Sequence, residues 1–215
     1  MSFYDVLDSN IADELLLYND NNKYLDILKG IEEGNLITAA VLTALIIEID
    51  KDITNSIKQS VSGSGVRVGD VKLKDIDYFG YNPDDIVKAN IQRYNKEVGL
   101  ADKDEYKALK FKLIRNISHV VNTATKIEVE KFRDKLDYGD DLIGFLSVAV
   151  LDDRTTDLCR SLHNVFYAIT DRSKVPNKPP RHINCRSQLI PIYKYMDYKD
   201  KDTSFSGFVT RNISK

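Results

Sequence analysis

The sequence predicts an α+β fold, with a helical N-terminal half followed by a small C-terminal module made of a short antiparallel sheet and a Pro-rich loop. Three observations lead to this prediction. Apolar residues recur at helical spacing in residues 36–60 and 102–127. Residues 143–150 then form a mostly apolar run with β-branched and aromatic members, which is typical of a strand. Prolines in residues 171–186 hold the next loop in an extended form.

The first long helix is expected in residues 36–60. Apolar side chains repeat there every four positions from Val41 to Ile57, so they share one face. Asn35 is positioned to cap the start of this helix. The sequence Ser-Gly-Ser-Gly at 62–65 is typical of a turn or linker and marks its end.

Two more helices follow. Asn82 can cap the next one, Pro83 suits its first turn, and Gly99 ends it. Asp102 then opens a long helix whose apolar residues are spaced by threes and fours. Such a stripe packs on other helices of the same chain or on a neighbouring subunit, and core packing is the preferred interpretation.

The remaining stretches complete the domain prediction. Residues 1–30 are expected to form short helices, and residues 66–73 are consistent with a small hairpin. The chain is therefore divided into a helical region (1–100), a core that combines the long helix with the small α+β module (101–192), and an extended C-terminal tail (193–215).

The C-terminal module is expected to begin with the strand at 143–150. Thr155 or Thr156 can cap a short helix after it. Second and third strands are expected at 166–169 and 188–192, and Pro191 places the third strand at a sheet edge, because proline cannot donate to the ladder.

The composition excludes several classes of protein. The chain has 31 Lys plus Arg and 33 Asp plus Glu, so it has no excess of positive charge. Nucleic-acid binding through the overall charge of the protein is therefore not expected to be its main function. The two cysteines are too few for a disulfide scaffold and fit a reducing cytoplasm. No membrane association is expected, because the longest apolar stretch, 36–47, is too short to span a bilayer and the N-terminus lacks the basic region of a signal peptide.

A candidate metal site stands out in the module. Cys159 and His163 are four residues apart, so on a helix they point the same way, and His182 and Cys185 lie three apart beyond the Pro-rich loop. These four side chains could make a tetrahedral zinc site, which would tether the loop to the helix. The alternatives are two small buried hydrophobic thiols, a disulfide in a released particle, or a surface position for His163.

Basic residues gather in the Pro-rich loop. Arg172, Lys174, Lys178 and Arg181 are candidates for contact with DNA phosphates or an acidic partner, and a solvated loop is the alternative.

Two enzyme interpretations also arise from the residues. Cys159 with a histidine and an aspartate resembles a thiol nucleophile arrangement, and His182 with Asp153 suits metal-assisted hydrolysis. The sequence shows neither an oxyanion-hole loop nor a carboxylate cluster, so a non-enzyme is predicted.

The module also resembles a known family. The motif comprises Asp153-Arg154-Thr155, Cys159, Leu162, Pro180, His182 and Cys185-Arg186, with a strand before and after it. In this order and spacing, over about residues 110–192, the chain resembles the phage Mu F-like family, the minor head or head morphogenesis proteins of tailed bacteriophages. Many members end the motif Cys-Arg-Cys, where this chain has Cys185-Arg186-Ser187.

The resemblance implies a minor capsid protein at the portal vertex or in the head interior. Its implied partners are the portal protein, other capsid proteins and packaged DNA, and its implied location is the virion, reached from the host cytoplasm during assembly. Asp153, Arg154, Thr155 and Arg186 are expected to be structural residues of the motif, with Arg154 locking the turn before the short helix. A zinc-dependent hydrolase or nuclease and a DNA-binding ejection protein are the alternative functions.

Overall fold

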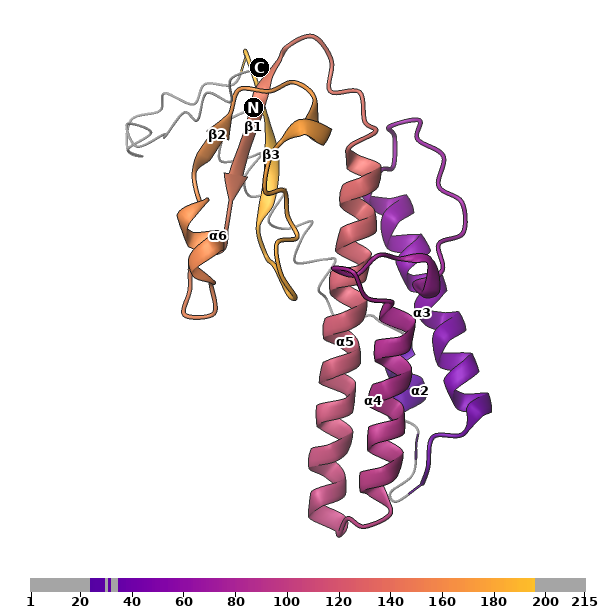
Figure 1. Cartoon of the computed structure of the whole chain (residues 1–215). Helices are drawn as coiled ribbons and strands as arrows, with labels where there is room; N and C mark the ends of the chain where they lie inside the picture. Colours follow the sequence, from indigo (N-terminus) through magenta and orange to yellow (C-terminus); the bar gives the residue numbers. More distant parts are fainter. Residues whose placement is uncertain (1–23, 30, 32–34, 196–215) are drawn as a thin grey trace. The chain divides into compact units, whose positions relative to one another are not determined.

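The computed structural model describes residues 24–29, 31 and 35–195 (Figure 1). It confirms the α+β class, because helices fill the N-terminal half and a three-stranded antiparallel sheet lies in the C-terminal part. The contacts divide these residues into a helical unit that ends at Val129 and a C-terminal unit that begins at Glu130. The short helices expected before residue 24 and the tail expected beyond residue 195 lie outside the described residues.

The helical unit contains α2 (Tyr24–Lys29), α3 (Ala39–Ser60), the 3-10 turn η1 (Leu73–Asp75), α4 (Pro83–Val98) and most of α5 (Lys103–Arg133). In α3 the four-residue repeat is buried as predicted, with Leu45, Ile49, Ile53 and Ile57 fully enclosed. Helix α3 begins later than predicted, because the hydroxyl of Thr38 accepts from the Val41 amide and caps it in place of Asn35.

The hairpin considered for residues 66–73 does not form. Instead, the Val71 amide donates to Thr54 Oγ1, and the Leu73 amide donates to Asp50 Oδ1. Polar side chains of α3 thus satisfy backbone groups that a second strand would otherwise pair, and the buried Leu73 anchors the segment.

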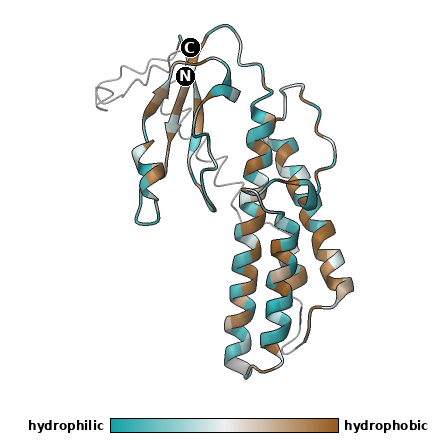
Figure 2. Ribbon diagram, in the orientation of Figure 1, coloured by the Kyte–Doolittle hydropathy of each residue, from teal (hydrophilic) through white to brown (hydrophobic). Residues whose placement is uncertain are grey.

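Helices α4 and α5 pack against each other within this unit. Asn82 caps α4 as predicted. Asn116 of α5 donates to Asn90 of α4, and the rings of Tyr94 and Tyr106 lie 6.5 Å apart. Figure 2 shows hydrophobic and hydrophilic residues alternating along these helices, as amphipathic packing requires.

The predicted boundary between residues 100 and 101 is therefore wrong. The apolar stripe of α5 packs on the helices before it, so all but the last turn of α5 belongs to the helical unit. No helix in the described part of the chain is long and apolar enough to cross a membrane.

The C-terminal unit is built on the strand order β2-β1-β3. Strand β1 (Leu142–Val148) pairs antiparallel with both β2 (Val165–Tyr167) and β3 (Gln188–Tyr193). Leu146 faces Phe166 on one side and Ile190 on the other. Strand β3 is an edge strand, as Pro191 predicted.

The connections between these strands carry the candidate site. The short helix α6 (Asp157–Ser161) lies between β1 and β2. A long loop, which contains the 3-10 turn η2 (Arg172–Lys174) and the cis peptide between Pro179 and Pro180, then leads back to β3. Since β2 and β3 flank the same central strand, the loop brings residues just before β3 back to the turn that follows β1 (Figure 1).

Candidate metal centre

The turn before α6 fixes the position of Cys159. Thr155 Oγ1 donates to the Val150 carbonyl and accepts from the Asp152 amide, which closes the turn after β1. Thr156 then caps α6, because its hydroxyl accepts from the Cys159 amide at 3.3 Å. Cys159 therefore lies in the first turn of α6, where it is buried.

Asp152, in the same turn, binds the segment just before β3. Both amino groups of Arg186 donate to the Asp152 carboxylate, at 2.6 and 2.5 Å. These bonds from Arg186 hold the pKa of Asp152 well below its usual range, and bonds from Thr155 and from the Arg154 amide add to the effect. The bidentate pair links the turn after β1 to the residues just before β3.

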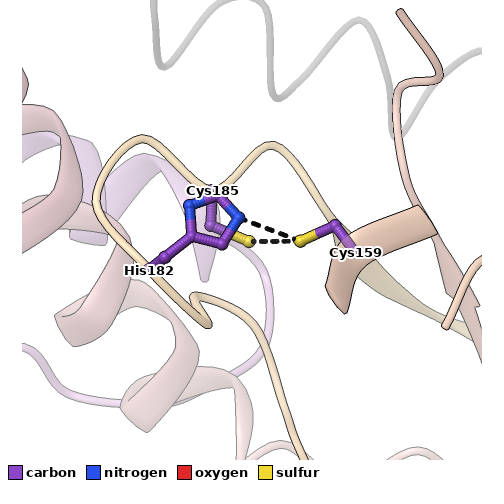
Figure 3. A group of neighbouring side chains, drawn as sticks. All are labelled: Cys159, His182 and Cys185. Atoms are coloured by element: carbon purple, nitrogen blue, oxygen red, sulfur yellow. Dashed lines mark hydrogen bonds between the residues drawn. The ribbon is translucent and has the colours of Figure 1, made fainter. Parts of the chain in front are cut away.

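Three potential metal ligands meet between these segments. Cys159 comes from α6, and His182 and Cys185 come from the end of the loop, and their side chains point toward one another (Figure 3). Cys159 Sγ lies 3.0 Å from His182 Nε2 and 3.6 Å from Cys185 Sγ. All three donor atoms lie within 4.8 Å of one another, so the group could hold a metal ion.

The orientation of His182 suits a metal ligand. Its Nδ1 lies 2.8 Å from the Ile183 carbonyl, which can only accept a hydrogen bond. The proton is therefore assigned to Nδ1, and the lone pair of Nε2 is directed at Cys159 and at the Thr156 hydroxyl, 3.0 Å away. Histidine ligands of metals usually donate their other N–H to a carbonyl or carboxylate in this way.

The spacing of the two sulfurs is close to that of a tetrahedral zinc site. With Zn–S bonds of about 2.3 Å, two thiolates on one zinc ion lie roughly 3.8 Å apart. The sulfurs of Cys159 and Cys185 are 3.6 Å apart, and they do not form a disulfide bond with each other. A disulfide bond, at about 2.0 Å, is much shorter.

The surroundings of Cys159 favour the thiolate that a metal needs. Burial alone would raise the pKa of this thiol, but the polar side chains around it, with Ser187 and Thr156 contributing most, outweigh burial and lower the pKa to about 6. The guanidinium of Arg181 lies 3.9 Å from Sγ. The buried Ser187 hydroxyl makes no hydrogen bond of good geometry, although it is close enough to lower the pKa of Cys159.

His163 does not join the cluster, and its prediction as a ligand is wrong. Helix α6 ends at Ser161, so the spacing of four that would align His163 with Cys159 does not apply. His163 lies beyond the helix, and its Nδ1 accepts from the Ala149 amide at 3.1 Å. Burial lowers the pKa of His163, which favours the neutral ring, and only the neutral ring can accept this hydrogen bond.

The residues predicted to be structural in the motif divide into two groups. Thr155 and Arg186 both stabilise the turn after β1. Thr155 bonds to the Val150 carbonyl, and Arg186 bonds to the Asp152 carboxylate. Asp153 and Arg154 are exposed. Arg154 reaches Asp152 only at 3.5 Å, so Arg186, and not Arg154, makes the bidentate contact that locks the turn.

The four basic residues of the loop mostly face inward. Arg172 is 2% exposed and pairs with Glu130 and Asp134, so its prediction as a surface contact is wrong. Burial alone would lower the pKa of this guanidinium, but the negative groups around it, with Glu130 foremost, raise the pKa above its usual value. Lys178 also pairs with Asp134.

The other two basic residues differ from each other. Arg181 donates to the Ser147 hydroxyl at 2.7 Å and to the Asn177 carbonyl, which turns it toward β1 and the centre. Lys174 is the one of the four that is mostly exposed, and it lies 3.4 Å from Asp171.

A small pocket connects the cluster to the surface. It is lined by Ala149, Val150, Arg154, Thr155, Thr156, Cys159, His182, Asn184, Arg186 and Ser187. No aspartate or glutamate is among these lining residues. The polar side chains that line this pocket beside Cys159 and His182 are hydroxyl groups, an amide and guanidinium groups.

Sequence reasoning missed two contributors to the centre. Thr156 was recognised as a helix cap, but its bond to His182 depends on the return of the loop. Ser187 was noted only as a departure from the family motif, and the structure places its buried side chain beside Cys159. Comparison of the chain with protein-family models, with curated proteins and with solved structures found no match.

Proposed function

We propose that this chain is a minor head protein of a tailed phage, associated with the portal vertex or the head interior, whose C-terminal unit is a docking module fixed by zinc. The order of the motif residues supports the head-protein assignment, and the cluster of Cys159, His182 and Cys185 supports the zinc site. The module would act by shape and by contacts with its partners, and not by catalysis.

The observation that carries the proposal is that candidate metal ligands from two distant segments lie close together. Cys159 and Cys185 are separated by 26 positions, yet their sulfurs are 3.6 Å apart. A metal held there would close a long loop onto a short helix, beside a sheet that has three strands in the described part of the chain. Metal binding stabilises such a small unit because the site does not exist in the unfolded chain.

Zinc is the metal that these donors favour. Two thiolates and an imidazole are soft and borderline ligands, whereas magnesium and calcium prefer oxygen. Two thiolates also neutralise the charge of a divalent ion, so the centre remains compatible with Arg181 beside Cys159.

The lining of the pocket supports a structural role for the metal. A hydrolytic site needs a group that accepts a proton from the attacking water, and a carboxylate commonly does this. The pocket beside the cluster is lined by no carboxylate, and its one imidazole belongs to the candidate ligand His182. The nearby carboxylate of Asp152 is occupied by Arg186.

A zinc-dependent hydrolase is the second candidate, because three protein ligands would leave a fourth coordination position open and two of the candidate ligands, Cys159 and His182, line the pocket. The test is to incubate the zinc-loaded chain with single-stranded and double-stranded DNA and with peptide substrates. Zinc-dependent cleavage that is lost in His182→Ala would favour the hydrolase over the docking module. The docking proposal predicts no cleavage above that of the variant.

The DNA-binding ejection protein has less support. Arg172, Lys178 and Arg181 are engaged within the C-terminal unit, and Lys174 is the exposed member of the predicted set. DNA affinity in such proteins comes from free cations that displace counterions from phosphates.

The head-protein proposal is tested by locating the chain in particles. Phage particles that carry the gene would be purified, with and without packaged DNA, and their proteins counted by quantitative mass spectrometry. We expect a few copies per particle in both preparations and cross-links to the portal protein. Absence from purified particles, with the chain recovered only from the cell lysate, would overturn the proposal.

A further inference from the structure

We propose that the candidate metal centre is also a redox site, in which oxidation joins Cys159 to Cys185 as a disulfide and releases the metal. This inference rests on the proposed function for the metal-bound state. The disulfide would keep the loop tied to α6 after the metal has left. The two thiols would therefore hold the same connection in reducing and in oxidising surroundings.

The positions of the two thiols carry this inference. Both are buried, and with Ala149 they form one small core cluster. Their sulfurs are 3.6 Å apart, so bond formation needs an approach of only about 1.6 Å. The two cysteines also come from separate segments, because Cys159 lies in α6 and Cys185 lies in the loop before β3. A bond between them therefore closes a loop of the same span as the metal does.

The contacts of His182 allow the metal to leave. Its Nε2 lies 3.0 Å from the Thr156 hydroxyl as well as from Cys159. When the thiolates become a disulfide, the imidazole keeps a hydrogen-bond partner in Thr156 and its Nδ1 bond to the Ile183 carbonyl. Loss of the metal thus leaves no buried imidazole without a partner.

The pocket gives a small oxidant a path to one of the two sulfurs. Cys159 lines it together with His182 and Ser187, whereas Cys185 does not. The guanidinium of Arg181, 3.9 Å from Cys159 Sγ, stabilises negative charge on this sulfur. Cys159 is therefore the thiol that reacts first, and Cys185 is the resolving thiol.

A peroxide is the class of oxidant that fits this path. The Cys159 thiolate attacks one oxygen of hydrogen peroxide, the O–O bond breaks, and a sulfenic acid and hydroxide form. Cys185 then attacks the Cys159 sulfur, the S–O bond breaks, and hydroxide leaves. In total, the two zinc-bound thiolates lose two electrons to the peroxide, the two hydroxide ions take up two protons from solvent to give two molecules of water, and the zinc ion is released.

A cytoplasm keeps thiols reduced, and the medium around a released particle does not. The metal-bound form would therefore belong to assembly, and the disulfide form to the mature particle.

The test uses the full chain loaded with one equivalent of zinc and titrated with hydrogen peroxide. Released zinc is followed with a chromophoric chelator, free thiols are counted, and the intact mass is measured without reductant. We expect one zinc ion to be released for each intramolecular disulfide formed, and dithiothreitol with zinc to restore the starting state. Zinc release with sulfinic acid at Cys159, or with disulfides between chains, would overturn the inference.

Variants separate this inference from the zinc proposal. His182→Ala keeps both thiols, so we expect weakened zinc binding and an intact ability to form the disulfide. Cys185→Ala keeps a small apolar side chain, and we expect overoxidation of Cys159 in place of a disulfide. His163→Asn preserves an acceptor for the Ala149 amide and should behave as the wild type.

The outcomes are distinguishable. If the chain binds no zinc but forms the disulfide, the zinc proposal is contradicted and the oxidation of Cys159 and Cys185 to a disulfide is retained. A chain that binds zinc and is oxidised without forming the disulfide would contradict the redox inference alone. Circular dichroism of each variant would show whether its helices and sheet have formed before oxidation is scored.

Discussion

The Nε2 atom of His182 lies 3.0 Å from the Sγ atom of Cys159, although 23 positions separate the two residues. The turn closed by Thr155 places one of them, and the return of the loop toward β3 places the other. This contact defines the candidate centre, because it brings an imidazole lone pair to a thiol within reach of a second thiol. Several measurable properties follow from it and from the contacts around it.

Zinc binding should depend on three side chains of the predicted four. His182→Ala, Cys159→Ala and Cys185→Ala should each weaken zinc binding by roughly tenfold or more, because loss of even an outer-shell partner commonly costs that much. His163→Asn should bind zinc as the wild type does, since His163 bonds to Ala149. Elemental analysis and competition with a chromophoric chelator provide the measurement. Equal losses in His163→Asn would show that the cluster is assigned wrongly.

Ser187→Cys should tighten zinc binding. The Ser187 side chain is 1% exposed and lies beside Cys159, at the motif position where many members of the resembled family carry cysteine. A thiolate there would supply a fourth ligand and complete a tetrahedral site of three sulfurs and one nitrogen. Cobalt substitution would report the change, because the visible spectrum of tetrahedral cobalt depends on the number of thiolates. Ser187→Ala is the matched control, and the prediction fails if both variants give the spectrum of the wild type.

Replacement of Arg172 should destabilise the C-terminal unit strongly. Its side chain is 1% exposed and is paired with Glu130, which is itself buried. Arg172→Met would leave the Glu130 charge without this partner, and breaking such a pair costs about 3–5 kcal/mol. Lys174→Met, two residues away and mostly exposed, should change the free energy of unfolding by less than about 0.5 kcal/mol. Urea denaturation compares the two, and equal effects would contradict the inward orientation of Arg172.

The stabilisation of the folded chain by the Asp152 carboxylate should persist at mildly acidic pH. Hydrogen bonds from Arg186 lower the pKa of this carboxyl in the folded state, so its stabilising effect is complete above the unfolded pKa, about 3.9, and is lost as the pH falls through the lower folded value. Wild type should therefore remain more stable than Asp152→Asn at neutral pH and through mildly acidic pH. Asp153→Asn, at an exposed neighbour, should show no such difference. Unfolding curves at a series of pH values would measure both, and a difference that disappears near neutral pH would count against the Arg186 contact.

Gly144 should not accept a side chain. Its φ is 155°, and a Cβ built there would lie 2.2 Å from the Tyr167 carbonyl oxygen and 2.7 Å from the Phe166 ring. Gly144→Ala must displace backbone of β2, and we expect a loss of about 1–3 kcal/mol in the stability of the C-terminal unit. Gly69→Ala meets no atom within 4 Å and serves as the control. Hydrogen exchange of the β1 and β2 amides would show whether the loss is local to the sheet.

Local signals in the sequence were sufficient for the helices and strands. The buried repeat of α3, the Asn82 cap of α4 and the apolar run of β1 appear near their predicted positions, because each depends on residues close together in the chain. Cys159, His182 and Cys185, three of the four residues predicted as ligands from residue types and spacing, do meet in the structure, although the loop that brings them together is long. Where local backbone groups found partners in another element, as in residues 66–73 with α3, the prediction failed.

The sequence by itself determined the α+β class, the Asn82 cap of α4, the helical periodicities and the residue types that could bind a metal. Only the tertiary structure decided which histidine joins the thiols, which arginine holds Asp152, and that Arg172 is buried. The physical reason is that helical spacing aligns two side chains only while the helix continues, and α6 ends before His163. Contacts between distant segments depend instead on where the chain reverses, and that is fixed by the packing of β1, β2 and β3 together.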